Sequence, residues 1–250
     1  FNLNYHVSPH IAIMPELSMT RLMGDDFSAS KNNKEGMSDY YIRNLHFRND
    51  ILSLSLLGQY DFYPNKEQYR RRPIHNFYAI AGISGVYSNP QAKDLEGKWV
   101  DLRKYKTENK SYSSFSVALP VGAGFRYKLA ISWDLEIEFT YNLCFSDYLD
   151  DVSGNYIDPL RLSSETAGYL SNRSAEEFSS LTGDMRDWEF IENVLEQKIV
   201  QLYPNYRYIE GSAPGDLRGN KKGPDRYVVV TFRFLHIFPG GKINCPKFRD

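Results

Sequence analysis

The sequence is poor in cysteine, in net charge and in long apolar runs. Two Cys among 250 residues exclude a disulfide-rich scaffold and most zinc sites. Its 30 basic and 31 acidic residues give a formal net charge of -1, so the chain has no positive field that would attract nucleic acid. No apolar run approaches about 18 residues, which excludes a transmembrane helix. Side-chain packing and backbone pairing must therefore hold this fold together.

Aromatic residues are abundant, and they lie in segments where apolar and polar positions alternate. The chain has 19 Tyr and 15 Phe, yet its mean hydropathy is -0.51. A membrane-spanning strand gives such a hydrophilic average because only every second residue faces lipid. The clearest alternation covers residues 133–148, and similar patterns occupy 115–129, 52–62 and 228–234. Residues 11–23 and 77–87 fit less cleanly, and residues 1–5 resemble the end of another strand.

Short and long connections alternate between these strands. Residues 6–10 and 130–132 are tight turns and 64–74 is a connection of moderate length, whereas 24–49, 88–113 and 149–225 are long and polar. In an antiparallel barrel this order gathers the turns at the periplasmic end and the long loops at the extracellular end. A barrel whose two termini lie at the same end needs an even number of strands, so we expect a first strand ahead of Phe1 and eight in total.

The sequence thus predicts an all-β fold, an eight-stranded antiparallel transmembrane β-barrel over residues 1–238. Residues 149–225 form its longest extracellular loop, with a helix expected near 185–200 from the spacing of apolar residues. Residues 239–250 form a short periplasmic tail. A barrel of eight strands is filled by its own side chains and is too narrow for an open aqueous channel.

The same alternation fits a soluble ligand-binding barrel whose apolar face points inward. Large aromatic residues at the strand ends favour the membrane barrel, and so do polar faces of small residues with isolated charges of both signs. Charges on the predicted lumen face are expected to pair with one another, because a narrow interior cannot hold them unpaired. They are Glu16, Asp61, Arg126, Glu136, Glu138 and Arg233. Arg21 lies on the lipid face near the long loops and is expected to reach the interface.

No residues with catalytic, cofactor-binding or metal-binding spacing stand out. Asp147, Asp150 and Asp151 could offer oxygens to Ca²⁺, but their spacing is not that of an EF-hand, and a hydrogen-bonded strand exit is the favoured interpretation. His46, expected in a long loop, is weak evidence for an outer-membrane protease or acyltransferase. The basic run at residues 69–72 is interpreted as a solvated turn that could meet anionic headgroups.

Four motifs, taken in order, are similar to those of a known family. They are NLHFRND at 44–50 leading into LSLLGQYDF at 54–62, FYAIAGI at 77–83, DYLDDVSGNY at 147–156, and KINCPKF at 242–248. The chain resembles the PorG-type outer-membrane barrels of the Bacteroidetes type IX secretion system over most of its length. The likeness is weakest in residues 161–222, where the long loop is enlarged.

The resemblance implies a non-enzymatic part of a protein-secretion complex. Such a barrel is expected in the outer membrane, bound to the periplasmic ring of the lipoprotein PorK and its partner PorN. An outer-membrane enzyme and a ligand-binding barrel are the alternatives. The residues expected to reach the ring are Lys242, Cys245, Pro246, Lys247 and Phe248. Cys144 is expected at the opposite rim, so Cys245 is a candidate for contact with a partner or a free thiol in the tail.

Overall fold

A computed structural model describes residues 1–65, 70, 72–219 and 223–238, and its main feature is one long antiparallel sheet. Neighbouring strands pair in the order β1-β2-β3-β4-β7-β8-β11. Their bounds are β1 Tyr5–His6, β2 Ile11–Asp25, β3 His46–Asp61, β4 His75–Tyr87, β7 Phe115–Ala130, β8 Trp133–Cys144 and β11 Arg226–His236. Each predicted segment of alternation therefore overlaps a strand, although residues 145–148 lie beyond β8 and only Tyr5 of residues 1–5 lies in β1. The prediction of a largely antiparallel β fold is confirmed.

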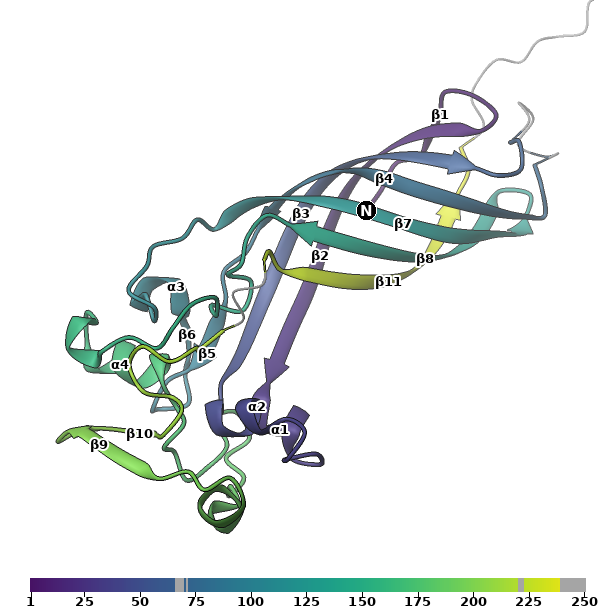
Figure 1. The fold of residues 1–250 in the computed structure, drawn as a ribbon. Helices are drawn as coiled ribbons and strands as arrows, with labels where there is room; N and C mark the ends of the chain where they lie inside the picture. Colours follow the sequence, from purple (N-terminus) through teal and green to yellow (C-terminus); the bar gives the residue numbers. More distant parts are fainter. Residues whose placement is uncertain (66–69, 71, 220–222, 239–250) are drawn as a thin grey trace, which may run out of the picture.

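The sheet is strongly curled, and its two edges approach each other (Figure 1). Among the described residues β1 pairs only with β2, and β11 pairs only with β8, so the sheet is open. A side-chain ion pair nevertheless crosses between the ends, because Arg233 Nη2 on β11 lies 2.7 Å from Glu16 Oε2 on β2. Backbone hydrogen bonds from residues 1–6 cover the outer edge of β2 as far as Leu17. We call the unpaired gap between β2 and β11 the seam.

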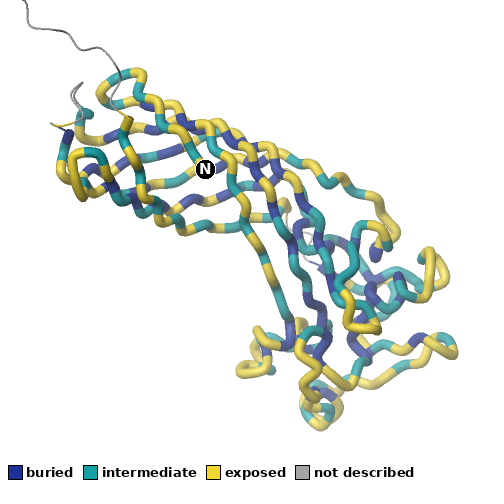
Figure 2. Tube along the Cα trace, turned by 180° about the vertical axis from the view of Figure 1, so that it is seen from behind, coloured by how far each residue is buried: buried dark blue, intermediate teal, exposed yellow. Residues whose placement is uncertain are grey.

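The apolar face of the sheet points outward and the polar face points inward. Leu54 on β3 is 67% exposed and Phe232 on β11 is 68% exposed, whereas Ser55 and Asn142 on the opposite face are each 8% exposed. Figure 2 shows the resulting alternation of exposed and buried residues along the strands. This orientation is the reverse of a soluble ligand-binding barrel, in which the apolar residues would line the interior.

The long connections fold together at one end of the sheet, and we call their described residues 26–45, 88–114, 145–219 and 223–225 the cap (Figure 1). The short turns lie at the other end. The cap contains α1 Asp26–Ser30, α2 Ser38–Arg43, β5 Gln91–Lys93, β6 Trp99–Asp101, α3 Leu102–Tyr105, a 3-10 turn at Pro159–Arg161, α4 Glu165–Ser171, a π-helix at Phe190–Val194, and the hairpin β9 Ile199–Tyr203 with β10 Tyr206–Ile209.

The cap has its own buried apolar side chains, drawn from loops far apart in the sequence. One cluster joins Phe27 and Tyr41 to Ile191 and Ile209. A second joins Ala92, Leu102 and Leu170. The cap is therefore packed as a folded unit.

Two loop predictions differ from the structure. The helix expected near 185–200 is shorter: it covers Trp188 and Glu189 and continues as the π-helix Phe190–Val194. Glu196 then adopts a positive φ of 53°, which ends the helix before β9. His46, expected in a loop, is the first residue of β3, because β2 and β3 pair as far as Asp25 and His46. No helix among the described residues is long and apolar enough to span a membrane.

Candidate functional site

The interior of the sheet brings together the six charged residues predicted for the lumen face. Arg126 Nε lies 2.6 Å from Glu136 Oε1, and Arg126 Nη1 lies 3.7 Å from Asp61 Oδ2. Arg233 lies 2.7 Å from Glu16, 2.8 Å from Glu138 and 3.8 Å from Glu136. Two guanidinium groups thus hold four carboxylates contributed by β2, β3 and β8. This arrangement ties the strands together.

Uncharged side chains complete this interior network. Gln59 donates to Asp61 Oδ1 at 2.8 Å, and Asn4 donates to Gln59 at 2.8 Å. Tyr78 donates its hydroxyl to Glu138 at 3.1 Å. The ring of Tyr78 lies against Gly124, where an added Cβ would stand 2.2 Å from the ring. Only glycine therefore leaves room for Tyr78 to reach the network from β4.

Arg72 fills the turn end of the sheet. Its guanidinium lies 2.6 Å from Asp134 and donates to the carbonyl oxygens of Ala130, Ile131 and Trp133. Arg72 is 6% exposed. The interpretation of residues 69–72 as a solvated basic run is therefore wrong for Arg72, because the turn between β7 and β8 presents three carbonyl groups and a carboxylate to it. Residues 69 and 71 of that run lie outside the described residues.

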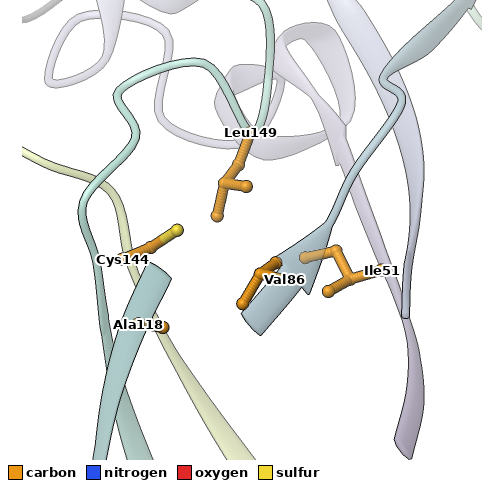
Figure 3. Close-up of a cluster of buried hydrophobic side chains, with 5 residues drawn as sticks. All are labelled: Ile51, Val86, Ala118, Cys144 and Leu149. Atoms are coloured by element: carbon orange, nitrogen blue, oxygen red, sulfur yellow. The ribbon is translucent and has the colours of Figure 1, made fainter. Parts of the chain in front are cut away.

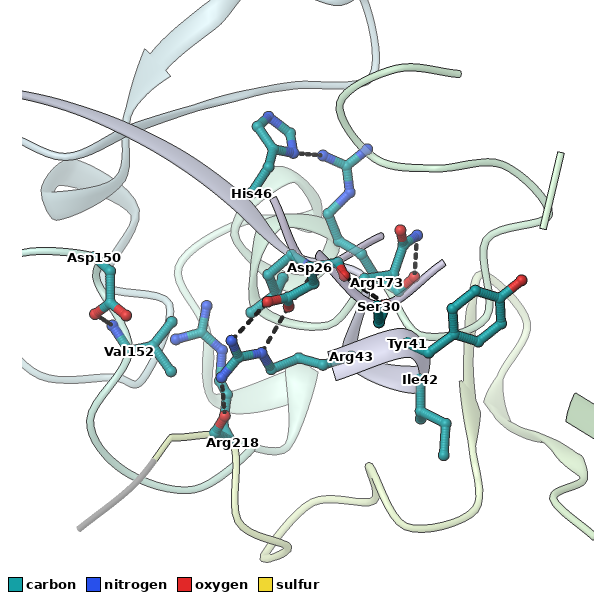
Figure 4. A network of polar contacts seen from close by, with 12 residues as sticks. Asp26, Ser30, Tyr41, Ile42, Arg43, His46, Asp150, Val152, Arg173 and Arg218 are labelled. Carbon is teal, nitrogen blue, oxygen red and sulfur yellow. Dashed lines mark hydrogen bonds and ion pairs between the residues drawn. The ribbon is translucent and has the colours of Figure 1, made fainter. Parts of the chain in front are cut away.

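A second ionic network holds the cap together. Arg218 lies 3.1 Å from Glu108 and 3.8 Å from Asp151, and it also donates to the carbonyl oxygens of Asp151 and Ser171. Figure 4 shows Arg43 between Asp26, to which it donates two hydrogen bonds, and the carbonyl of Arg218. All three long loops meet in this network. No local sequence pattern indicates this network, because Glu108 and Arg218 are 110 residues apart.

The three neighbouring aspartates each serve a different partner. Asp147 accepts from the hydroxyl of Ser153 at 2.5 Å, and Asp150 accepts from the backbone N–H of Val152 at 3.0 Å. Asp151 is 1% exposed and accepts from Thr107 and Tyr112. These contacts agree with the hydrogen-bonded strand exit favoured from the sequence. Among the described residues no group of His, Cys, Asp and Glu side chains could hold a metal ion.

His46, at the start of β3, is buried against the cap and is oriented as a structural residue. Its Nε2 accepts from the backbone N–H of Lys93 at 2.8 Å, so the proton of the neutral ring lies on Nδ1. Nδ1 lies 2.8 Å from Ser180 Oγ and therefore donates to that hydroxyl. A catalytic histidine must instead accept the proton of its serine. The hydrogen bond between His46 and Ser180 therefore runs in the opposite direction to the one that nucleophilic catalysis requires.

Arg21 finds a partner on the neighbouring strand. Its Nε and Nη2 donate to Asp50 at 2.5 and 2.9 Å, and the two residues are directly opposite in the β2–β3 register. The expectation that Arg21 reaches the interface alone is thus modified, because a cross-strand carboxylate neutralises it on the outer surface.

We predict that the cap becomes less stable as the pH rises from about 4 to about 6. Burial raises the pKa of Asp151 from 3.8 to about 6, although Arg218 opposes the shift. Because the folded pKa exceeds the unfolded one, the folded cap holds an extra proton in this window and loses that advantage on ionisation. Ionisation of Asp151 should lower the free energy of unfolding by about 3 kcal/mol across the window, and Asp151→Asn should reduce the fall by that amount. Burial also raises the pKa of Asp225, to about 7, so part of the fall should persist in this variant.

This pH dependence is measurable by urea unfolding followed through the fluorescence of the cap tryptophans, Trp99 and Trp188. Asp184→Asn at an exposed cap position is the matched control and should keep the wild-type slope. An Asp151→Asn protein with the same slope as wild type would contradict the assignment.

The residues predicted to bind a partner, Lys242, Cys245, Pro246, Lys247 and Phe248, lie outside the described residues. The chain matches no protein-family model, no curated protein and no solved structure.

Proposed function

We propose that this chain is an outer-membrane β-barrel that serves as a non-enzymatic anchor in a protein-secretion complex. The observation that carries the membrane part is the outward apolar face of every long strand, which includes Leu54, Phe139 and Phe232. Soluble monomers rarely expose apolar patches larger than a few hundred Å². Lipid is the solvent that this face suits.

An eighth strand seated along the seam completes the proposed barrel. Beyond Leu17 the outer edge of β2 has no strand partner among the described residues, and the outer edge of β11 has none along its whole length. Unpaired backbone groups cost several kcal/mol each in hydrocarbon, so a membrane barrel must close. The ion pair from Arg233 to Glu16 supports closure here, because it already holds the two sides of the seam together.

The outward face gives a direct test. Leu54→Arg places a charge near the middle of β3, where it should cost roughly 2 to 4 kcal/mol of stability in a bilayer. The protein should fractionate with outer membranes and refold into lipid vesicles, and the variant should refold with a much lower yield. Ser55→Arg is unsuitable as a control because Ser55 is buried, so the exposed cap residue Leu160→Arg is the matched control. Recovery of wild-type protein in the aqueous fraction would reject the membrane proposal.

The secretion role is supported by the resemblance of the four sequence motifs to PorG-type barrels. Under this proposal the tail at residues 239–250 contacts the periplasmic ring formed by PorK and PorN. The interior network supports an anchor over a conduit, because Arg126 reaches from β7 past β4 to Asp61 on β3, and Arg233 reaches across the seam from β11 to Glu16 on β2. The reversed polarity of the His46–Ser180 pair supports a non-enzymatic role.

A pull-down from native membranes in mild detergent tests this role. The full chain should retain the ring proteins, and a variant with Cys245→Ser and Phe248→Ala should retain less of them. A matched change at Leu160→Ala in the cap should retain as much as wild type. Isolation of the barrel alone from native membranes would reject the anchor.

A further inference from the structure

A layer of apolar side chains crosses the interior just below the cap. Its buried members are Ile51, Val86, Ala118, Cys144 and Leu149, and Leu22 and Tyr227 pack against them. We call these seven residues the diaphragm. Figure 3 shows Leu149 pointing from the cap toward the space between Cys144 and Val86. Each of the six long strands supplies one member, so the layer spans the whole curled sheet.

The diaphragm separates two polar regions. On its turn side lies a cavity of about 1310 Å³, lined by His6, Arg72, Ser53 and Asn142 and, where it opens at the seam, by Met19 and Phe232. On its cap side Asn49 is fully buried and hydrogen-bonded. An apolar layer between polar regions resists wetting, as hydrophobic constrictions do in channels. The diaphragm is therefore placed to stop water and ions from passing through the interior.

Leu149 is the only diaphragm residue that does not belong to a strand. Its carbonyl oxygen accepts from Asn49 Nδ2 at 2.8 Å, and its N–H donates to Asp225 Oδ2 at 2.7 Å. Asn49 is fixed in turn by the N–H of Asn89, 2.9 Å from Asn49 Oδ1. These bonds attach the backbone of Leu149 to β3 and to the residue that precedes β11. The position of this side chain thus depends on the folded cap.

We propose that Leu149 is a stopper that the cap holds in the diaphragm, so that the interior is a blind chamber closed at the cap end. This inference rests on the proposed barrel and is independent of the proposed secretion role. Displacing the cap, for example by a ligand that binds it, withdraws the stopper and connects the chamber with the outside.

The diaphragm contains one thiol, that of Cys144, whose accessibility reports whether the diaphragm is closed. Cys144 is fully buried, and its Sγ lies 3.2 Å from Ser116 Oγ. The chain has two Cys, so Cys245→Ser leaves Cys144 as the single thiol. The test, in this background, is the rate at which a small charged methanethiosulfonate reagent labels the folded protein in detergent. Wild-type Leu149 should give slow labelling, and Leu149→Gly should raise the rate at least about tenfold because the thiol becomes reachable.

Three matched variants separate the stopper from a general loosening of the fold. Leu149→Met conserves volume and should label slowly, whereas Leu149→Ala should give a rate between those of wild type and Leu149→Gly. Leu160→Gly changes an exposed leucine of the same loop and should label as wild type does. Folding of each variant is checked by the shift in electrophoretic mobility on heating, and Leu149→Ala provides the test if Leu149→Gly does not fold.

Slow labelling of folded Leu149→Gly and Leu149→Ala would overturn the proposal, and so would equal acceleration by Leu160→Gly. Failure of the barrel is distinguishable, because it shows as loss of wild-type protein from the membrane fraction and not as a change in Cys144 labelling.

Discussion

Arg218→Met should destabilise the cap by about 3 to 5 kcal/mol, the usual cost of removing one partner from a buried ion pair. Arg218 is 3% exposed, and its loss leaves Glu108 and Asp151 buried without their guanidinium. The carbonyl oxygens of Asp151 and Ser171 lose their donor as well. Limited proteolysis should therefore cleave the cap in Arg218→Met under conditions where the wild-type cap is intact.

Two further variants sharpen this experiment. Arg207→Met removes an exposed arginine from β10 and should be cleaved like wild type. Replacing the carboxylates together with the arginine, as Glu108→Gln, Asp151→Asn and Arg218→Met, should recover part of the loss because no charge is then left unpaired. If Arg218→Met and Arg207→Met resist the protease equally, Arg218 does not hold the loops together.

The second large effect is expected at Arg233, in the interior network. Arg233→Met removes the only guanidinium that touches Glu16, and it leaves Glu138 with no arginine partner among the described residues. We expect a loss of about 3 to 5 kcal/mol, mainly from the unpaired carboxylate of Glu138, which is buried, whereas Glu16 is partly exposed. The ion pair between Arg233 and Glu16 also crosses the seam, so the variant should let β2 and β11 move apart as well as weaken the interior network.

Arg226→Met is the matched control, because Arg226 is an exposed residue at the start of the same strand. Heat-dependent electrophoretic mobility should show Arg233→Met unfolding at a lower temperature than wild type or Arg226→Met. Glu16→Gln and Glu138→Gln added to Arg233→Met should raise that temperature again. Equal unfolding temperatures for Arg233→Met and Arg226→Met would show that the pair across the seam is unimportant.

The two networks act at different levels of the molecule. Arg126 and Arg233 join strands and so fix the curl of the sheet, whereas Arg218 and Arg43 join loops and so fix the cap. The diaphragm lies between them. A rigid cap is needed for the proposed stopper, since Leu149 takes its position from Asn49 and Asp225.

The strands and the lumen charges could be predicted from sequence because both depend on a local period of two. Residues 115–129 were predicted as a strand and form β7 Phe115–Ala130, and the alternation from residue 133 ends in β8 at Cys144. Parity along each strand also assigned Glu136, Glu138 and Arg233 to one face, which the structure places inside. The closed barrel of eight strands stays a proposal, because the described sheet is open.

The tertiary structure decided how the loops meet, and it decided between the two orientations of the faces that alternation by itself leaves open. Alternation is the same whether the apolar face points in or out, so the exposure of Leu54 and burial of Ser55 had to come from the curl of the sheet. Arg218 and Glu108 pair across 110 residues, and Arg72 reaches Asp134 across 62. No local pattern encodes such partners, because they depend on how the ends of different strands are brought together. The sequence by itself determined where the strands lie and which residues share an apolar or a polar face. The tertiary structure determined that the apolar face points outward, how the loops pack into the cap, and the position of Leu149 that the proposed stopper requires.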